Sequence, residues 1–222
     1  MSNFNIYCML KKRFPVIEVC AATLAAAIAA DKSGADRIEL CQDIENGGTT
    51  PSHADIEYCI HHLKLKINVL VRPRAGNFVY SDAEFETIKK DVLFCKNLGV
   101  NAVVVGFLND DFSIDVAKTS EIVTLAHPME VTFHRAFDVC ADWKIAIEQI
   151  IECGCTRILT SGQKPTAIEG SENIKLMVKH AGERIIILAG SGITMENYQE
   201  LVNFTEVKEV HGTKLESFQE KD

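Results

Sequence analysis

The sequence predicts a closed, TIM-type (β/α)8 barrel, and three observations support this fold class. Eight short β-branched runs alternate with amphipathic stretches, and successive runs start 22 to 35 residues apart, as successive βα units do. Several of these runs are preceded by a glycine in the same position. The 222 residues, 47% of them hydrophobic, match the length and core of one barrel.

The eight runs are expected to form the parallel strands of the barrel. They cover residues 15–20, 37–41, 66–73, 101–107, 130–134, 156–161, 184–190 and 207–211. Between them, residues 82–98 show apolar side chains at helical intervals. Gly34, Gly99 and Gly154 are each expected to end a helix in the left-handed conformation, directly before a strand begins.

One domain is expected over residues 15–222, after a short N-terminal extension over residues 1–14. No linker or composition break divides it, and no GxGxxG fingerprint follows the first strand, which argues against a dinucleotide-binding sheet. The basic cluster at 11–13 follows the apolar residues, whereas a secretory signal carries its positive charge first. We therefore expect a cytoplasmic protein whose eight cysteines are reduced.

The overall charge and hydropathy make two classes of partner unfavourable. A net charge of −8 repels phosphate backbones, so no nucleic-acid partner is expected. No apolar run reaches the ~18 residues of a membrane span, so no membrane partner is expected either.

Strand alternation places ionisable residues inside the barrel. If Ile17 and Val19 face the helices, Glu18 and Cys20 face inward. The same alternation turns these residues inward on other strands: Arg37, Glu39, Cys41, Arg72, Arg74, Thr132, His134, Glu209 and His211. They lie near the C-terminal strand ends, where barrel enzymes build their sites. The set is therefore either a functional site or a salt-bridge network that holds the strands in register.

Two small loops are candidates for anion binding through backbone N–H groups. Ser161 and Gly162 follow the sixth strand, and Gly190 and Gly192 flank a serine after the seventh. Phosphate sites of barrels lie after strands seven and eight. An ordinary tight turn explains the same residues equally well.

A set of motifs along the chain resembles the CutC copper-homeostasis family. The motifs are Glu18-Val19-Cys20, residues 34–41, residues 47–52, Arg72-Pro73-Arg74, residues 80–82, residues 131–138 and residues 157–162. The resemblance runs from about Val16 to His211. It implies a TIM-barrel-like cytoplasmic protein that is linked to copper homeostasis and self-associates into a homo-oligomer.

The chain departs from the family pattern at three places. Ala75 stands where a second glycine usually follows the Arg-Pro-Arg motif, and Ser191 stands within a usual run of three glycines. Only eleven residues follow His211, too few for a closing helix of the usual length. Whether the barrel is complete at its C-terminal helix is therefore left open.

The resemblance implies that Cys20 and Cys41 bind copper as Cu(I). This soft ion prefers thiolates, and two inward thiols at the ends of adjacent strands can share one ion. Nearby Glu18 and Glu39 oppose this reading, because negative charge raises the pKa of a thiol. Two ordinary core cysteines are the other interpretation.

The alternative function is a barrel enzyme that acts on a small anionic metabolite, either a carboxylate or a phosphate. Glu18 or Glu39 would then be a general base, and His134 or His211 a general acid. The expected ligand-binding residues are Arg37, Arg72, Arg74, Ser161, Gly162, Gly190 and Gly192. No motif fixes a reaction class, so whether the protein is an enzyme stays open.

Overall fold

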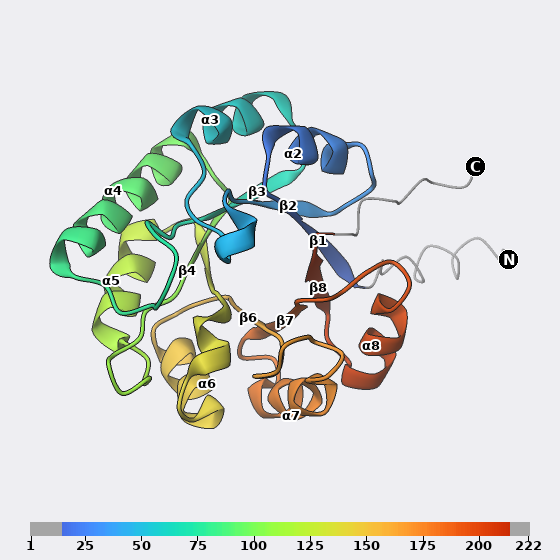
Figure 1. Cartoon of the computed structure of the whole chain (residues 1–222). Coiled ribbons are helices and arrows are strands. Elements are labelled where there is room, and N and C mark those ends of the chain that lie inside the picture. Colours follow the sequence, from blue (N-terminus) through green and yellow to red (C-terminus); the bar gives the residue numbers. More distant parts are fainter. Residues whose placement is uncertain (1–14, 214–222) are drawn as a thin grey trace, which may run out of the picture.

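The computed structural model describes residues 15–213 and shows a closed barrel of eight parallel strands (Figure 1). The strands are β1 (Val16–Ala21), β2 (Arg37–Leu40), β3 (Lys66–Leu70), β4 (Ala102–Val105), β5 (Glu130–Phe133), β6 (Arg157–Thr160), β7 (Ile186–Gly190) and β8 (Glu209–Gly212). They pair in chain order around the ring. The predicted fold class and all eight strand positions are confirmed, with ends that differ by a few residues.

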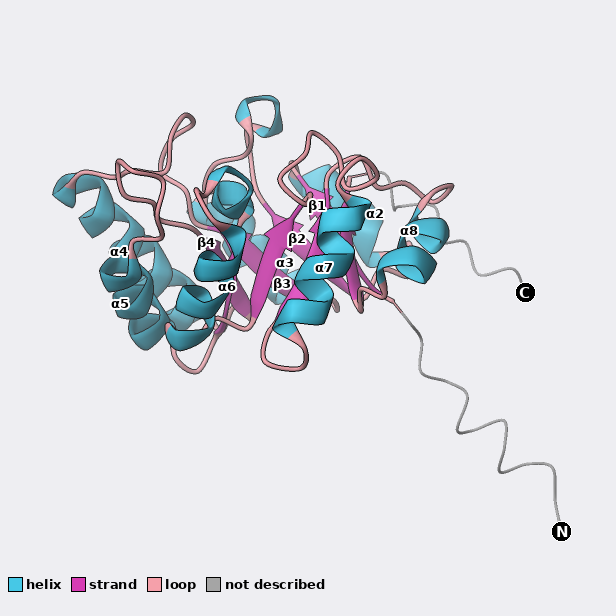
Figure 2. Ribbon diagram, turned by 90° about the horizontal axis from the view of Figure 1, so that it is seen from below, coloured by secondary structure: helices cyan, strands magenta, loops and turns pink. Residues whose placement is uncertain are grey.

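The helices of the described residues form a layer outside the ring of strands (Figures 1 and 2). They are α2 (Leu24–Asp31), α3 (His53–His62), α4 (Asp82–Leu98), α5 (Val116–Ala126), α6 (Trp143–Glu152), α7 (Ser171–Ala181) and α8 (Tyr198–Thr205). Two 3-10 helices lie in the loops after β2 and β5, η1 (Ile44–Asn46) and η2 (Arg135–Val139). Among the residues described, no helix is long and apolar enough to cross a membrane.

Local sequence explains the best-defined helix, α4. Ser81 caps its N-terminus by accepting from the backbone of Glu84, whose side chain accepts in return from the backbone of Ser81. Gly99 ends the helix at φ 83°, a left-handed conformation that glycine adopts without strain. The buried face carries Phe85 and Ile88, which pack against the strands. The expected glycine stop at the end of this helix is thus confirmed.

The strand ring closes between β1 and β8. Glu18 is in register with His211, and Val16 with Glu209. Within residues 15–213 no helix follows β8, yet the ring of strands is complete. The expected N-terminal extension over residues 1–14, and the residues after 213, lie outside the described part of the chain.

The apolar core lies between the strands and the helices. Outward-facing strand residues such as Val19, Ile38 and Val103 are fully buried there. The inward-facing residues of the same strands include buried charged groups, as alternation predicts. The barrel interior is therefore a polar compartment enclosed by an apolar shell.

Candidate functional site

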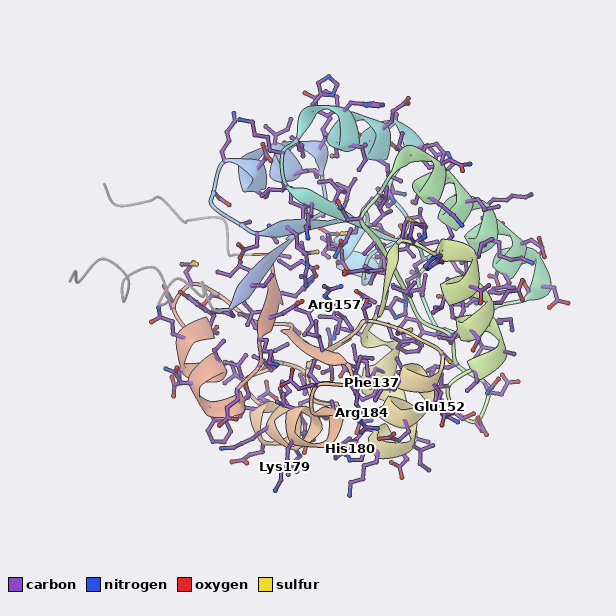
Figure 3. The ribbon with its side chains drawn as sticks, turned by 180° about the vertical axis from the view of Figure 1, so that it is seen from behind. Phe137, Glu152, Arg157, Lys179, His180 and Arg184 are labelled. Atoms are coloured by element: carbon purple, nitrogen blue, oxygen red, sulfur yellow. The ribbon has the colours of Figure 1, made fainter. Side chains whose placement is uncertain are left out.

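A network of ion pairs fills the lower part of the barrel interior, which is the part nearer the N-terminal ends of the strands. The Arg37 guanidinium donates to the carboxylates of Glu18 and Glu209. Arg157, which lies inside the ring of strands in Figure 3, donates from Nε to Glu209 Oε2 at 2.9 Å and also pairs with Glu130. Because Arg37 and Arg157 each pair with two carboxylates, the network compensates its charges and ties strands together across the barrel.

Above this network, β1, β2 and β8 bring thiols, a carboxylate and an imidazole together. The Sγ atoms of Cys20 and Cys41 lie 3.6 Å apart. His211 Nδ1 lies 2.7 Å from Glu18 Oε1, and His211 Nε2 lies 3.7 Å from Glu39 Oε2. One ligand atom each from Cys20, Glu39 and His211 lies within 4.8 Å of the others, so these residues could surround one cation.

Burial and neighbouring charges shift the pKa values of this cluster. Burial would raise the pKa of Glu18, but Arg37 and the hydrogen bond with His211 outweigh it and lower that pKa to about 2. Burial would lower the pKa of His211, but Glu39 and Glu18 raise it to about 9. Burial raises the pKa of Glu39 above its usual value. The Glu18–His211 contact is therefore an ion pair at neutral pH.

The thiol of Cys20 is strongly held in its protonated form. Its hydrogen bond with Cys41, its burial and the charge of Glu39 all raise its pKa. A metal ion that binds here must displace this proton.

A cavity of about 220 Å³ opens above the cluster, at the C-terminal ends of the strands. It is smaller than the ~300–1,000 Å³ of pockets for drug-sized ligands. The residues that line it are Cys20, Glu39, Cys41, Ile44, Gly47, Gly48, Leu70, Arg72, Phe78, His134, Arg135, Leu159, Ser191, His211, Gly212 and Thr213. A larger cavity of about 460 Å³ lies between α7, α8 and the start of β7, and it shares no residue with this one.

His134 enters the cavity wall from the end of β5 as a neutral imidazole. Its burial and the charge of Arg72 lower its pKa to about 3. Its Nδ1 accepts from the Ala136 backbone N–H at 3.1 Å, which assigns the ring proton to Nε2. Within the described part of the chain, that Nε2 is buried without a hydrogen-bond partner.

The two arginines that were expected to share the inner side lie in different places. Arg72 lines the cavity, and its Nη atoms donate to the carbonyls of Gly48 and Gly76, each at 2.8 Å. Arg74 lies outside the lining, where it pairs with Glu84. The expectation is wrong for Arg74 because β3 ends at Leu70, so strand alternation no longer sets the direction of residue 74.

Arg37 and the glycine-loop residues also lie away from the cavity lining. Arg37 belongs to the ion-pair network below it. The backbone N–H of Ser161 donates to Asp138, and that of Gly162 donates to Thr160 Oγ1 at 2.9 Å. Gly190 leaves room for the side chain of Leu159, and Gly192 leaves room for that of Thr166 in the loop after β6.

Several residues of the cavity wall were not predicted as site residues, among them Phe78, Arg135 and Ser191. Phe78 and Ser191 lie in loops, where alternation makes no prediction. Arg135 directly follows His134 in the motif of residues 131–138, and this position next to a predicted site residue could have indicated it. The Arg135 side chain donates to Asp138 Oδ2 at 2.8 Å and to Ser161 Oγ at 2.9 Å, so it connects the loops after β5 and β6.

Comparison with known proteins places the chain in a family. The profile of the CutC family matches residues 15–216. A CutC family protein of Parabacteroides distasonis is 44% identical over 197 residues, which cover 88% of this chain and 81% of the relative. The crystal structure of a Streptococcus agalactiae CutC, whose name refers to copper homeostasis, is 36% identical with a TM-score of 0.86, covering 90% of this chain and 99% of the other.

More distant structures share only the fold. An aldolase named QR15 aligns with a TM-score of 0.72 at 14% identity, covering 94% of each chain. The family match spans all of the described residues and includes every strand of the barrel. The protein therefore belongs to the CutC family.

Proposed function

We propose that this protein handles copper in the cytoplasm by binding Cu(I) through the thiolates of Cys20 and Cys41. The observation that carries the proposal is the 3.6 Å separation of the two Sγ atoms at the mouth of the barrel. The copper-homeostasis name of the related structure supports the choice of metal. Soft thiolate ligands favour Cu(I) over hard cations such as Mg²⁺.

The spacing of the thiols suits a shared ion. With metal–sulfur bonds of about 2.3 Å, as in zinc thiolates, a 3.6 Å sulfur separation corresponds to a sulfur–metal–sulfur angle of roughly 100°. This is close to tetrahedral, and small side-chain rotations would open it toward the wider angle of two- or three-coordinate Cu(I). Both cysteines can therefore reach one ion without a change of the backbone.

Neighbouring charges decide whether two thiolates are tolerated. Two thiolates on one Cu(I) leave one negative charge in a buried site, which is costly without compensation. His211 supplies a positive charge near Cys41, and the raised pKa of Glu39 favours its neutral form. Since His211 is protonated at neutral pH, we assign it the role of counter-charge and leave the two sulfurs as ligands.

Anaerobic Cu(I) titration of the full-length protein tests this proposal. Wild type is expected to bind one Cu(I) per protein chain, and the double substitution Cys20→Ala with Cys41→Ala is expected to abolish that binding. The matched control is Cys59→Ala with Cys95→Ala, which removes two buried thiols of α3 and α4. Equal Cu(I) binding by the cavity double variant and by wild type would overturn the proposal.

A second candidate is an enzyme that acts on a small anionic metabolite. It is favoured by the position of His211 and Glu39, a protonated imidazole and a carboxyl group that face the same cavity. A screen of anionic metabolites for a rise in melting temperature, followed by assay of the hits for turnover, tests it. Turnover that survives Glu39→Gln would contradict the assigned roles.

The family resemblance also implies a homo-oligomer, which we include in the proposal. Light scattering of the purified full chain is expected to show a multiple of the 24.6 kDa monomer mass. A monomer at micromolar concentration would contradict it.

A further inference from the structure

Among residues 15–213, Arg72 is a buried cation without a carboxylate partner. The other five arginines in residues 15–213 each pair with at least one carboxylate: Arg37, Arg74, Arg135, Arg157 and Arg184. Arg72 is only 5% exposed, yet in the same part of the chain no carboxylate lies within 4.0 Å of its guanidinium. Backbone carbonyls accept from its Nη atoms, but these neutral dipoles supply no opposite net charge.

Two hydrogen-bond donors on this side of the cavity are also unused. Arg72 Nε and His134 Nε2 are both buried, and neither has a hydrogen-bond partner in the described structure. Phe78 connects the two residues, because its ring centroid lies 5.0 Å from Arg72 Cζ and 4.9 Å from the His134 ring centroid. All three residues line the cavity. Buried donors are rarely left unpaired in folded proteins, so these atoms point to a ligand.

The absence of a side chain at Gly106 leaves the space that the His134 ring occupies. A Cβ atom on Gly106 would lie 2.4 Å from His134 Nδ1, so only glycine at this position lets the ring occupy its observed place. Thr132, two residues before His134 on the same inward face of β5, has a buried hydroxyl that likewise lacks a partner among the described residues. The β5 side of the barrel interior thus holds buried polar atoms without hydrogen-bond partners among the described residues, in contrast to the paired network of β1, β2 and β8.

We propose that the cavity binds a small monocarboxylate, whose carboxylate group accepts hydrogen bonds from His134 Nε2 and Arg72 Nε and neutralises the Arg72 charge. One unpaired positive charge and two free donors match one carboxylate group. A phosphate group carries about −1.5 to −2 charges and three acceptor oxygens, more than these groups compensate.

This inference rests on the second candidate function only for the entry of a small anion into the cavity, and it narrows the anion to a carboxylate. It does not require turnover or copper. The rest of the ligand would extend toward Glu39 and His211, which line the opposite side of the same cavity. A carboxylate that binds but is not converted would therefore contradict the proposed enzyme activity and still support the carboxylate site.

Calorimetric titration of the metal-free, full-length protein tests the proposal. The probes are acetate, lactate and pyruvate, with inorganic phosphate as the competing anion and acetamide as the neutral analogue of acetate. At least one carboxylate is expected to bind wild type. His134→Phe keeps a ring but removes the donor, and Arg72→Met removes the charge, so each should weaken binding at least about tenfold. The control is His53→Phe, an exposed histidine outside the cavity that is expected to change nothing.

Three results would overturn the proposal. They are the failure of all three carboxylates to bind, binding of phosphate or acetamide as strong as that of the carboxylates, and unchanged affinity in His134→Phe. If either cavity variant fails to fold, the wild-type protein labelled with ¹⁵N-histidine provides the measurement. The Nε2 resonance of His134 must then shift when the carboxylate is added, and an unmoved resonance counts against the site.

Discussion

His211 Nδ1 lies 2.7 Å from Glu18 Oε1, so a buried ion pair joins the last strand of the barrel to the first. The backbones of β8 and β1 pair at the same two residues. Glu18 also accepts from Arg37 and from Asn68 Nδ2, which extends the connection to β2 and β3. The Glu18 carboxylate therefore connects β8, β1, β2 and β3 where the barrel closes.

The first prediction concerns stability above neutral pH. The folded pKa of His211, about 9, is raised above its ordinary value of 6.5. Its charge therefore stabilises the fold fully below pH 6.5, and this contribution is lost as the pH rises through about 9. Denaturant unfolding of wild type should show a loss of up to about 3 kcal/mol across this window. His211→Gln should remove most of that dependence, and equal slopes in both proteins would contradict the ion pair.

The second prediction concerns the ion-pair network. Glu209→Gln leaves Arg37 and Arg157 each short of a carboxylate inside the barrel. Breaking a buried pair on one side typically costs about 3–5 kcal/mol, so the free energy of unfolding should fall by that order. Glu183→Gln is the control, because its partner Lys208 lies at the surface and exposed pairs contribute little. Similar losses in both variants would show that the network is not a major source of stability.

Strand alternation made much of the site predictable. Glu18, Glu39 and His211 point inward because a strand turns successive side chains to opposite faces, a rule that needs only local sequence. The rule stops where a strand stops, which is why it misplaced Arg74 four residues beyond the end of β3. That no carboxylate of residues 15–213 pairs with Arg72 could not be predicted, because it depends on every carboxylate that could approach in three dimensions.

The third prediction concerns the pH dependence of Cu(I) binding. The raised pKa of Cys20 means that a proton must leave when the metal binds. Apparent Cu(I) affinity should therefore rise with pH, by up to about tenfold per pH unit for each proton displaced. Competition with a chromophoric Cu(I) chelator at several pH values measures this dependence. A flat profile would mean that the copper ligands are not these protonated thiols.

The fourth prediction concerns the space that Gly106 leaves for His134. An alanine Cβ at this position would lie 2.5 Å from His134 Cε1 and 3.0 Å from Ala136 Cβ, so the imidazole must move. Gly106→Ala should lower the free energy of unfolding by about 1–3 kcal/mol through overpacking. It should also weaken the proposed carboxylate binding, because the displaced ring no longer presents Nε2 to the cavity.

Substitution of Gly99 separates the loss of stability from the loss of carboxylate binding. An alanine Cβ at Gly99 would meet nothing within 4 Å, but φ there is 83°, so Gly99→Ala should lower stability by backbone strain alone. Because Gly99 lies beyond the C-terminus of α4 and away from the cavity lining, carboxylate affinity should stay at the wild-type value. Melting curves and calorimetric titration of both variants give the comparison. Wild-type affinity in Gly106→Ala would mean that the position of His134 does not determine binding, whereas selective loss in that variant ties the ligand to the imidazole.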